Sequence, residues 1–182
     1  MKPLTSDIWT LRAPGDWVVI PTNAGWNSQG ANVMGAGLAK QAADRYPDLP
    51  RCYGVECRKF AGFCSSQGVL MAISPWLYPQ GRLVLAVTKA LNQNAPHLSW
   101  RKPSTLDDVC GTIESLHLLL SGLPMDDERT EAWKTGRLLV PALGCGAGGL
   151  NLSDVLPLLE ALRDRHPDRV VLVLPDGHGS AG

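Results

Sequence analysis

Short apolar runs alternate along this chain with stretches that carry apolar residues at helical spacing. The runs predict buried strands at Trp17–Pro21, Val69–Ile73, Leu83–Val87, Leu138–Val140 and Val170–Leu174. The helical spacing predicts helices over Ala36–Tyr46, from Leu106 to Leu120, and over Ser153–His166. Strands that alternate with helices favour an α/β fold, with helices packed on a largely parallel sheet.

Each predicted helix has an expected inner face. In the first helix this face is Leu38, Ala42 and Tyr46, and Pro47 ends the helix. The second begins at Ser104-Thr105-Leu106-Asp107, which is typical of a capping box, and its inner face is Leu106, Val109, Ile113, Leu116 and Leu120. The third turns inward Val155, Leu158, Leu159 and Leu162.

The connecting segments are expected to be less regular. Ser74–Gly81 is predicted to be a turn-rich link between two strands, since it contains two prolines. We expect irregular structure in Cys52–Gln67, Ala90–Pro103, Gly122–Gly136 and Pro175–Gly182.

Composition places the chain among globular proteins. The 182 residues, 45% of them hydrophobic and 19% charged, predict a single domain over residues 1–182, which we expect to be a monomer. A net charge of zero provides no overall attraction to nucleic acid, so such contact requires a local patch. No apolar run is long enough to span a membrane, and the start of the chain lacks the apolar core of a signal peptide. These features favour a cytoplasmic location.

Five cysteines cannot all be paired in disulfides. Cys52, Cys57 and Cys64 are separated by four and six residues, which does not match the C-x-x-C spacing of zinc ligands. We therefore predict reduced thiols, no metal and no cofactor.

Two glycine-bearing loops, each directly after an apolar run, are the candidate ligand site. The first apolar run, Val18–Asn23, leads to Gly30-Ala31-Asn32-Val33-Met34-Gly35-Ala36-Gly37-Leu38-Ala39-Lys40. The second, Arg137–Ala142, leads to Leu143-Gly144-Cys145-Gly146-Ala147-Gly148-Gly149-Leu150. A strand followed by a glycine-rich turn leaves backbone N–H groups unpaired, and such groups bind phosphate without lysine. Two loops of this kind predict one ligand held at both ends, with a diphosphate as the first hypothesis.

The second loop also fits the dinucleotide pattern GxGxxG. Too little chain follows it for the remaining strands of a Rossmann unit, which argues against a dehydrogenase. A phosphate-binding loop of another α/β fold is favoured, and a plain structural turn is the alternative.

The strand ending at Asn23, the Val33-Met34-Gly35-Ala36-Gly37-Leu38-Ala39 helix start and the late Gly144–Leu150 loop occur in this order in macrodomains. The chain resembles that family over roughly residues 15 to 175, and is most similar to its branch of DNA ADP-ribosyl glycohydrolase antitoxins and terminal ADP-ribose glycohydrolases. The resemblance implies a three-layer α/β/α macrodomain with a mostly parallel mixed sheet. It also implies an ADP-ribose cleft, and it leaves room for a toxin partner.

The resemblance assigns ligand-binding residues to both loops. Residues facing the distal ribose would be Asn32, Val33, Met34, Gly35 and Gly37, and further ligand-binding residues would be Thr22 and Asn23. Residues around the diphosphate would be Gly144, Cys145, Gly146, Ala147, Gly148, Gly149 and Leu150. Val33 and Met34 would supply an apolar wall, although methionine also commonly fills gaps in a core.

Lys89 is the candidate catalytic residue. It follows the strand Leu83–Val87, at the position where the glycohydrolase branch carries a catalytic lysine. There it would attack or polarise C1″ of the distal ribose, or protonate the leaving group, if burial lowers its pKa. The alternative is a solvated loop lysine.

The chain departs from the family pattern at two places. Gly148 occupies the position of an aspartate in the terminal ADP-ribose glycohydrolases, which places a lysine–aspartate pair in doubt. The segment after Lys89 is longer than in the antitoxins. Within it, Trp100-Arg101-Lys102 would stack a base and hold a phosphate, or would form an ordinary surface loop.

The resulting hypothesis is a hydrolase that removes ADP-ribose from a nucleic acid or a protein. A binding module without turnover and an ADP-ribose 1″-phosphate phosphatase are the alternatives. All three need the same cleft.

Overall fold

The computed structural model describes residues 4–5, 7–67, 75–122, 133 and 135–175. Within them, one sheet of six strands has the order β1-β6-β5-β2-β4-β3. The strands are β1 (Leu4–Thr5), β2 (Trp17–Asn23), β3 (Trp76–Tyr78), β4 (Leu83–Lys89), β5 (Leu138–Pro141) and β6 (Val170–Leu174). All neighbouring strands run parallel except β3 and β4. The mostly parallel mixed sheet expected from the sequence is therefore confirmed.

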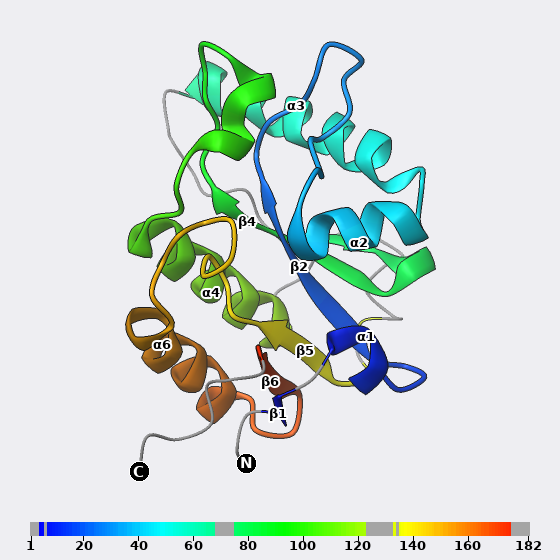
Figure 1. Ribbon diagram of the computed structural model, residues 1–182, viewed down its shortest axis with the longest axis vertical. Helices are drawn as coiled ribbons and strands as arrows, with labels where there is room; N and C mark the ends of the chain where they lie inside the picture. The colour runs from blue at the N-terminus through cyan, green and yellow to red at the C-terminus, as the bar shows by residue number, and fades with distance from the viewer. Residues whose placement is uncertain (1–3, 6, 68–74, 123–132, 134, 176–182) are drawn as a thin grey trace.

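Helices cover both faces of this sheet (Figure 1). They are α1 (Ile8–Leu11), α2 (Gly37–Arg45), α3 (Leu49–Gln67), α4 (Leu106–Leu120) and α6 (Leu152–Arg165), with short 3₁₀ turns η1 (Pro79–Gly81) and η2 (Pro96–Arg101). Trp17 and Val19 of β2 pack with α4 and α6, whereas Val18 and Ile20 pack with α2 and α3. The three-layer α/β/α architecture is confirmed, and burial on both faces explains why the strands are continuous apolar runs. None of the helices in the described ranges is long and apolar enough to cross a membrane.

The segment Cys52–Gln67, expected to be irregular, is instead part of the 19-residue helix α3. Leu49, Tyr53 and Cys57 are fully buried at a spacing of four residues, so one stripe of the helix faces the core. The two glycines and the polar residues between these positions obscure that stripe in the sequence. Packing against the sheet stabilises the helix despite its low intrinsic propensity.

Helix α4 has the predicted bounds, but its capping box and part of its inner face differ from the prediction. The capping box uses Thr105 and Asp108 rather than Ser104 and Asp107. Leu106, expected to face inward, is 41% exposed because it opens the first turn, and Leu119 is buried in its place beside a half-buried Leu120. The remaining inner positions of α4 are buried as predicted.

Other expectations are met in part. The predicted strand Val69–Ile73 lies outside the described residues, and the predicted turn Ser74–Gly81 contains β3 and η1. β3 forms because Trp76, Leu77 and Tyr78 pair with β4 and cover the core. The expected loop Ala90–Pro103 contains η2. Most of Gly122–Gly136 and of Pro175–Gly182 lies outside the described residues.

Candidate functional site

A cavity of about 620 Å³ lies where β2, β4 and β5 end. This volume falls within the range of roughly 300–1,000 Å³ that is usual for small-molecule sites. Two loops border it: the asparagine loop (residues 24–36) and the glycine loop (residues 143–150). The lining residues are Pro21, Thr22, Asn23, Val33, Gly35, Ala36, Gly37, Leu38, Ala39, Thr88, Lys89, Trp100, Arg101, Pro141, Ala142, Gly144, Gly146, Ala147 and Gly148. Both predicted loops and Lys89 therefore share one cleft.

Most of the predicted site residues line this cavity, while five do not. The five are Asn32, Met34, Cys145, Gly149 and Leu150. Met34 is 8% exposed and packs in the core under α2 and α3, as the gap-filling alternative predicts. Leu150 packs against the core on the α4 side. A ligand-binding role for each of the predicted residues remains a prediction.

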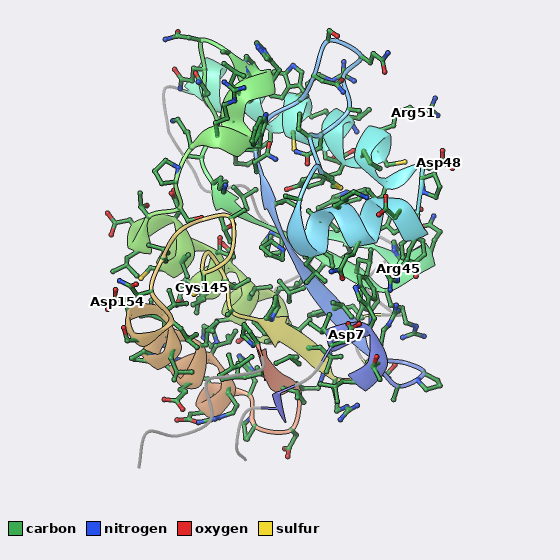
Figure 2. All side chains as sticks on the ribbon, viewed as in Figure 1. Asp7, Arg45, Asp48, Arg51, Cys145 and Asp154 are labelled. Carbon is green, nitrogen blue, oxygen red and sulfur yellow. The ribbon has the colours of Figure 1, made fainter. Side chains whose placement is uncertain are left out.

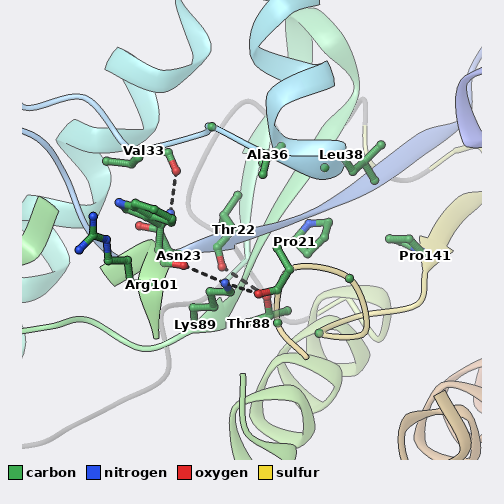
Figure 3. A pocket seen from close by; sticks show the side chains of 18 of the residues that line it. Pro21, Thr22, Asn23, Val33, Ala36, Leu38, Thr88, Lys89, Arg101 and Pro141 are labelled. Atoms are coloured by element: carbon green, nitrogen blue, oxygen red, sulfur yellow. Dashed lines mark hydrogen bonds between the residues drawn. The ribbon is translucent and has the colours of Figure 1, made fainter. Parts of the chain in front are cut away.

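The two asparagines of the predicted site shape the asparagine loop. Asn23 donates from Nδ2 to the Val33 carbonyl (2.8 Å) and accepts the Gly25 N–H at Oδ1 (3.0 Å). Asn32 donates from Nδ2 to the carbonyls of Asn23 (2.8 Å) and Gly25 (2.7 Å). These bonds close the loop on the end of β2, and Figure 3 shows Asn23 reaching Val33.

A buried polar network connects this loop to α3. The Asn32 amide lies 3.8 Å from Cys57 Sγ, Cys57 is hydrogen-bonded to Tyr53, and Thr22 Oγ1 donates to Tyr53 Oη (3.1 Å). Burial raises the pKa of Cys57 to about 12 and raises the pKa of Tyr53 above its usual range. Both side chains therefore stay protonated and support the cavity from below. The sequence did not predict this role, because it expected their segment to be irregular.

The glycine loop presents unpaired backbone donors. Gly144 and Gly149 adopt φ of +74° and +82°, conformations that L side chains rarely take, and they turn the chain tightly. The loop closes on itself through Leu150 N–H to Gly144 O (3.0 Å) and Gly149 N–H to Gly146 O (3.0 Å). In the described part of the chain, the N–H groups of Gly146, Ala147 and Gly148 have no acceptor. Such consecutive donors form an anion-binding nest.

The start of α2 supplies a second set of donors. Its N-cap residue, Ala36, makes no side-chain capping bond. Residues 35–39 line the cavity, so the free N–H groups of the first turn and the positive end of the helix dipole lie at its wall. The cavity is thus bordered by uncapped backbone donors at two places.

Lys89 lies between the two loops. Its Nζ donates to the Ala147 carbonyl (2.6 Å) in the glycine loop and to the Trp100 carbonyl (2.8 Å) in η2. Figure 3 shows Lys89 beside Thr88 and Asn23, where β2 and β4 end. Burial lowers the pKa of Lys89 below the usual range of lysine, which favours the neutral amine more than at an exposed site.

Arg101 provides the second cation of the lining. Its guanidinium lies 5.1 Å from the ring centroid of Trp100, and Trp100 is 43% exposed at the cavity. Among the described lining residues, the charged groups are Lys89 and Arg101, both cationic. Together with the free N–H groups, they suit an anionic ligand. Lys102, the third residue of the predicted patch, instead donates to the Leu91 carbonyl (3.2 Å).

The other reactive side chains near the site are not activated. Figure 2 shows Cys145 on the same side of the molecule as Asp154, near the start of α6. Burial and the negative charge of Asp154 raise the pKa of the Cys145 thiol, which disfavours a thiolate nucleophile. Cys52, Cys57, Cys110 and Cys145 are free thiols. No group of three His, Cys, Asp or Glu side chains in the described residues is placed to hold a metal ion.

Comparison with known proteins identifies the fold. No family model and no curated protein sequence matches the chain.

Among solved structures, the macrodomain of Mycobacterium tuberculosis DarG is 22% identical, over 97% of this chain and 99% of its own, with a TM-score of 0.66. The macrodomain of Thermus aquaticus DarG is 22% identical over 94% and 95%, with a TM-score of 0.63. The structure of Thermosipho africanus DarTG in complex with ADP-ribose matches at 22% identity and a TM-score of 0.60, over 90% of this chain and 39% of its own. The chain therefore has the macrodomain fold, in the form found in these DarG structures.

Proposed function

We propose that this chain binds ADP-ribose in the cavity and hydrolyses an ADP-ribosyl bond to a nucleic acid or a protein. The position of Lys89 carries the proposal, because its Nζ lies at the strand ends between both loops and is bonded to Ala147 of the glycine loop. The Thermosipho africanus neighbour was solved with ADP-ribose, which supports the same ligand here. A toxin partner remains a prediction.

The lining fits the chemistry of this ligand. The diphosphate would bind the free N–H groups of residues 146–148 and the start of α2, where backbone donors offset its charge. Pro21, Val33, Leu38 and Pro141 offer apolar surface to the adenine and ribose rings.

In the proposed reaction, the bond between C1″ of the distal ribose and the acceptor atom breaks. The acceptor leaves with the electron pair and gains a proton, and water supplies the hydroxyl group at C1″. Lys89 either gives its proton to the leaving acceptor, or attacks C1″ as the neutral amine and forms an Nζ–C1″ bond that water then breaks, which returns the free lysine. The lowered pKa favours both roles over those of an exposed lysine.

A binding module without turnover is the second candidate. Two observations favour it. The Lys89 ammonium group already donates hydrogen bonds to two carbonyls, and the described lining residues include no carboxylate. ADP-ribosylated DNA, ADP-ribosylated protein and ADP-ribose 1″-phosphate, offered side by side, separate the candidates. Release of ADP-ribose from the DNA or the protein supports the hydrolase, and release from the 1″-phosphate alone indicates the phosphatase.

Replacing Lys89 tests its role directly. We expect Lys89→Ala to lower turnover by about 100-fold or more, because a positioned acid or nucleophile contributes at least that much. ADP-ribose affinity, measured by calorimetry and expected in the micromolar range, about −8 kcal/mol, should change only severalfold. Lys102→Ala, which removes a nearby lysine outside the cavity lining, is the matched control.

Three results would contradict the proposal. Parental turnover by Lys89→Ala on a confirmed substrate excludes the lysine mechanism. If the parent binds ADP-ribose but releases none from any of the three substrates, the binding module is the better description. If calorimetry detects no ADP-ribose binding, both candidates fail and the fold alone remains.

A further inference from the structure

The segment from Trp100 to Ser104 links the cavity to the start of α4. Its first residue accepts the Lys89 ammonium proton at the carbonyl, and its last donates its N–H to the Gly148 carbonyl (3.0 Å). Lys89 also bonds to Ala147, so the segment and the glycine loop are tied at two neighbouring points. A shift of the glycine loop would therefore move the backbone of Ser104 directly.

The side chain of Ser104 has no partner although it is buried. Ser104 is 5% exposed, and within the described residues its Oγ makes no hydrogen bond. The capping role that the sequence suggested for it belongs to Thr105, whose Oγ1 accepts the Asp108 N–H (3.1 Å). The Ser104 hydroxyl therefore has no structural task at the helix start.

This hydroxyl lies against the inner side of the glycine loop. A Cβ atom built on Gly144 would lie 3.2 Å from Ser104 Cβ, and one built on Gly148 would collide with both Ser104 Oγ and the Gly144 carbonyl oxygen. The hydroxyl and this carbonyl thus border the same small space. A modest rotation of the Gly144 peptide group would bring its carbonyl oxygen within hydrogen-bond distance of the Ser104 hydroxyl.

We propose that Ser104 is a positioning residue of the glycine loop. When a diphosphate binds the N–H groups of residues 146–148, the loop turns and the Ser104 hydroxyl donates to the Gly144 carbonyl. A buried hydroxyl without a partner costs free energy in the ligand-free protein. The new hydrogen bond removes this cost, and so it favours the ligand-bound form of the loop. This inference rests on the proposed function only in taking the ligand to contain a diphosphate.

Ser104→Ala separates this role from a purely structural one. Removal of an unpartnered hydroxyl should leave the melting temperature of the ligand-free protein unchanged or higher. The same variant should bind ADP-ribose and inorganic pyrophosphate about threefold to tenfold more weakly, because it lacks a hydrogen bond made only in the complex. Ser115→Ala, inside α4, is the control serine: its hydroxyl already donates to the Gly111 carbonyl (2.8 Å). The control should keep the affinity of the parent for both probes.

The outcomes distinguish this proposal from the proposed function. A lower melting temperature for Ser104→Ala, or affinity equal to or tighter than that of the parent, overturns the positioning role. Parental binding of ADP-ribose without turnover, or of pyrophosphate alone, contradicts the hydrolase but leaves the Ser104 comparison valid. If the parent binds neither probe, the glycine loop takes no diphosphate and this proposal fails too.

Discussion

Gly146 and Gly148 lie two positions apart in the glycine loop, but their surroundings differ. A Cβ atom on Gly146 would meet nothing within 4 Å, whereas one on Gly148 would collide with the Gly144 carbonyl and the Ser104 hydroxyl. From the sequence alone, both glycines are expected to be equivalent positions of a surface loop. The structure makes Gly148 necessary for the loop itself and leaves Gly146 open to substitution.

We expect Gly146→Glu to abolish ADP-ribose binding while the free energy of unfolding stays within about 0.5 kcal/mol of the parent, the range of most surface changes. The carboxylate would fill the nest and repel a diphosphate. Calorimetry and urea unfolding measure the two effects. Gly62→Glu, at an exposed and open position on α3, is the control and should bind normally. Parental affinity for Gly146→Glu would mean that the diphosphate binds elsewhere.

At the residue scale, the sequence predicts where Lys89 lies but not what it contacts. Its position at the end of an apolar run, together with the family resemblance, places it at the carboxyl edge of the sheet. Its bonds to the Trp100 and Ala147 carbonyls depend on η2 and on the turn of the glycine loop. Neither backbone path has a periodic pattern that sequence reasoning can use.

Helix α3 approaches the asparagine loop at a glycine. A Cβ atom on Gly54 would collide with the Gly30 carbonyl and lie 2.7 Å from the Asn32 N–H nitrogen. The Asn32 N–H itself donates to the Pro50 carbonyl (2.8 Å) at the start of the same helix. The helix therefore supports the loop by direct backbone contact.

Gly54→Ala should lower the free energy of unfolding by about 1–3 kcal/mol, because the methyl group forces α3 away from the loop. It should also weaken ADP-ribose binding, since the asparagine loop borders the cavity. Gly62→Ala on the same helix has open space and should raise stability by about 0.5–1 kcal/mol, as alanine does in a helix. Urea unfolding and calorimetry check both variants. Equal changes in the free energy of unfolding for Gly54→Ala and Gly62→Ala would contradict the contact between Gly54 and the asparagine loop.

At the element scale, prediction succeeds where burial repeats regularly. β6 has the predicted bounds, and β2, β4 and β5 extend the predicted runs by one or two residues. These strands are buried on both faces, so hydrophobicity alone marks them. α3 was missed because its stabilising contacts come from the sheet and from a loop distant in sequence. β3 was missed because its antiparallel pairing with β4 lies inside a proline-bearing link.

Across the whole molecule, a histidine pair joins the two helices of one layer. His117 Nδ1 on α4 lies 2.8 Å from His166 Nε2 at the end of α6. One of these nitrogens must be unprotonated to accept the bond. Burial, followed by the positive charges of His117, Arg169 and Arg165, lowers the pKa of His166 below its usual value of 6.5.

This lowered pKa makes stability depend on pH. The unfolded chain protonates His166 first as the pH falls below 6.5, whereas the folded protein resists until lower pH, so the free energy of unfolding should decrease over that window. Above pH 6.5, His166 is neutral in both the folded and the unfolded chain, so its protonation no longer lowers the free energy of unfolding. Urea unfolding between pH 7.5 and pH 5 measures the slope. His166→Gln should reduce it, and a slope equal to that of the parent would exclude the pair as its source.

The central position of β2 has a consequence for synthesis of the protein. β2 emerges early, but it pairs on one side with β4 and on the other with β5, where Trp17 meets Leu138. Such distant pairings form late, because a long stretch of chain must close first. β5 and the glycine loop must therefore leave the ribosome before the complete lining of the cavity can assemble. Until then, the edge of β2 that later pairs with β5 presents unpaired backbone N–H and C=O groups, and Trp17 and Val19 lack the cover of α6.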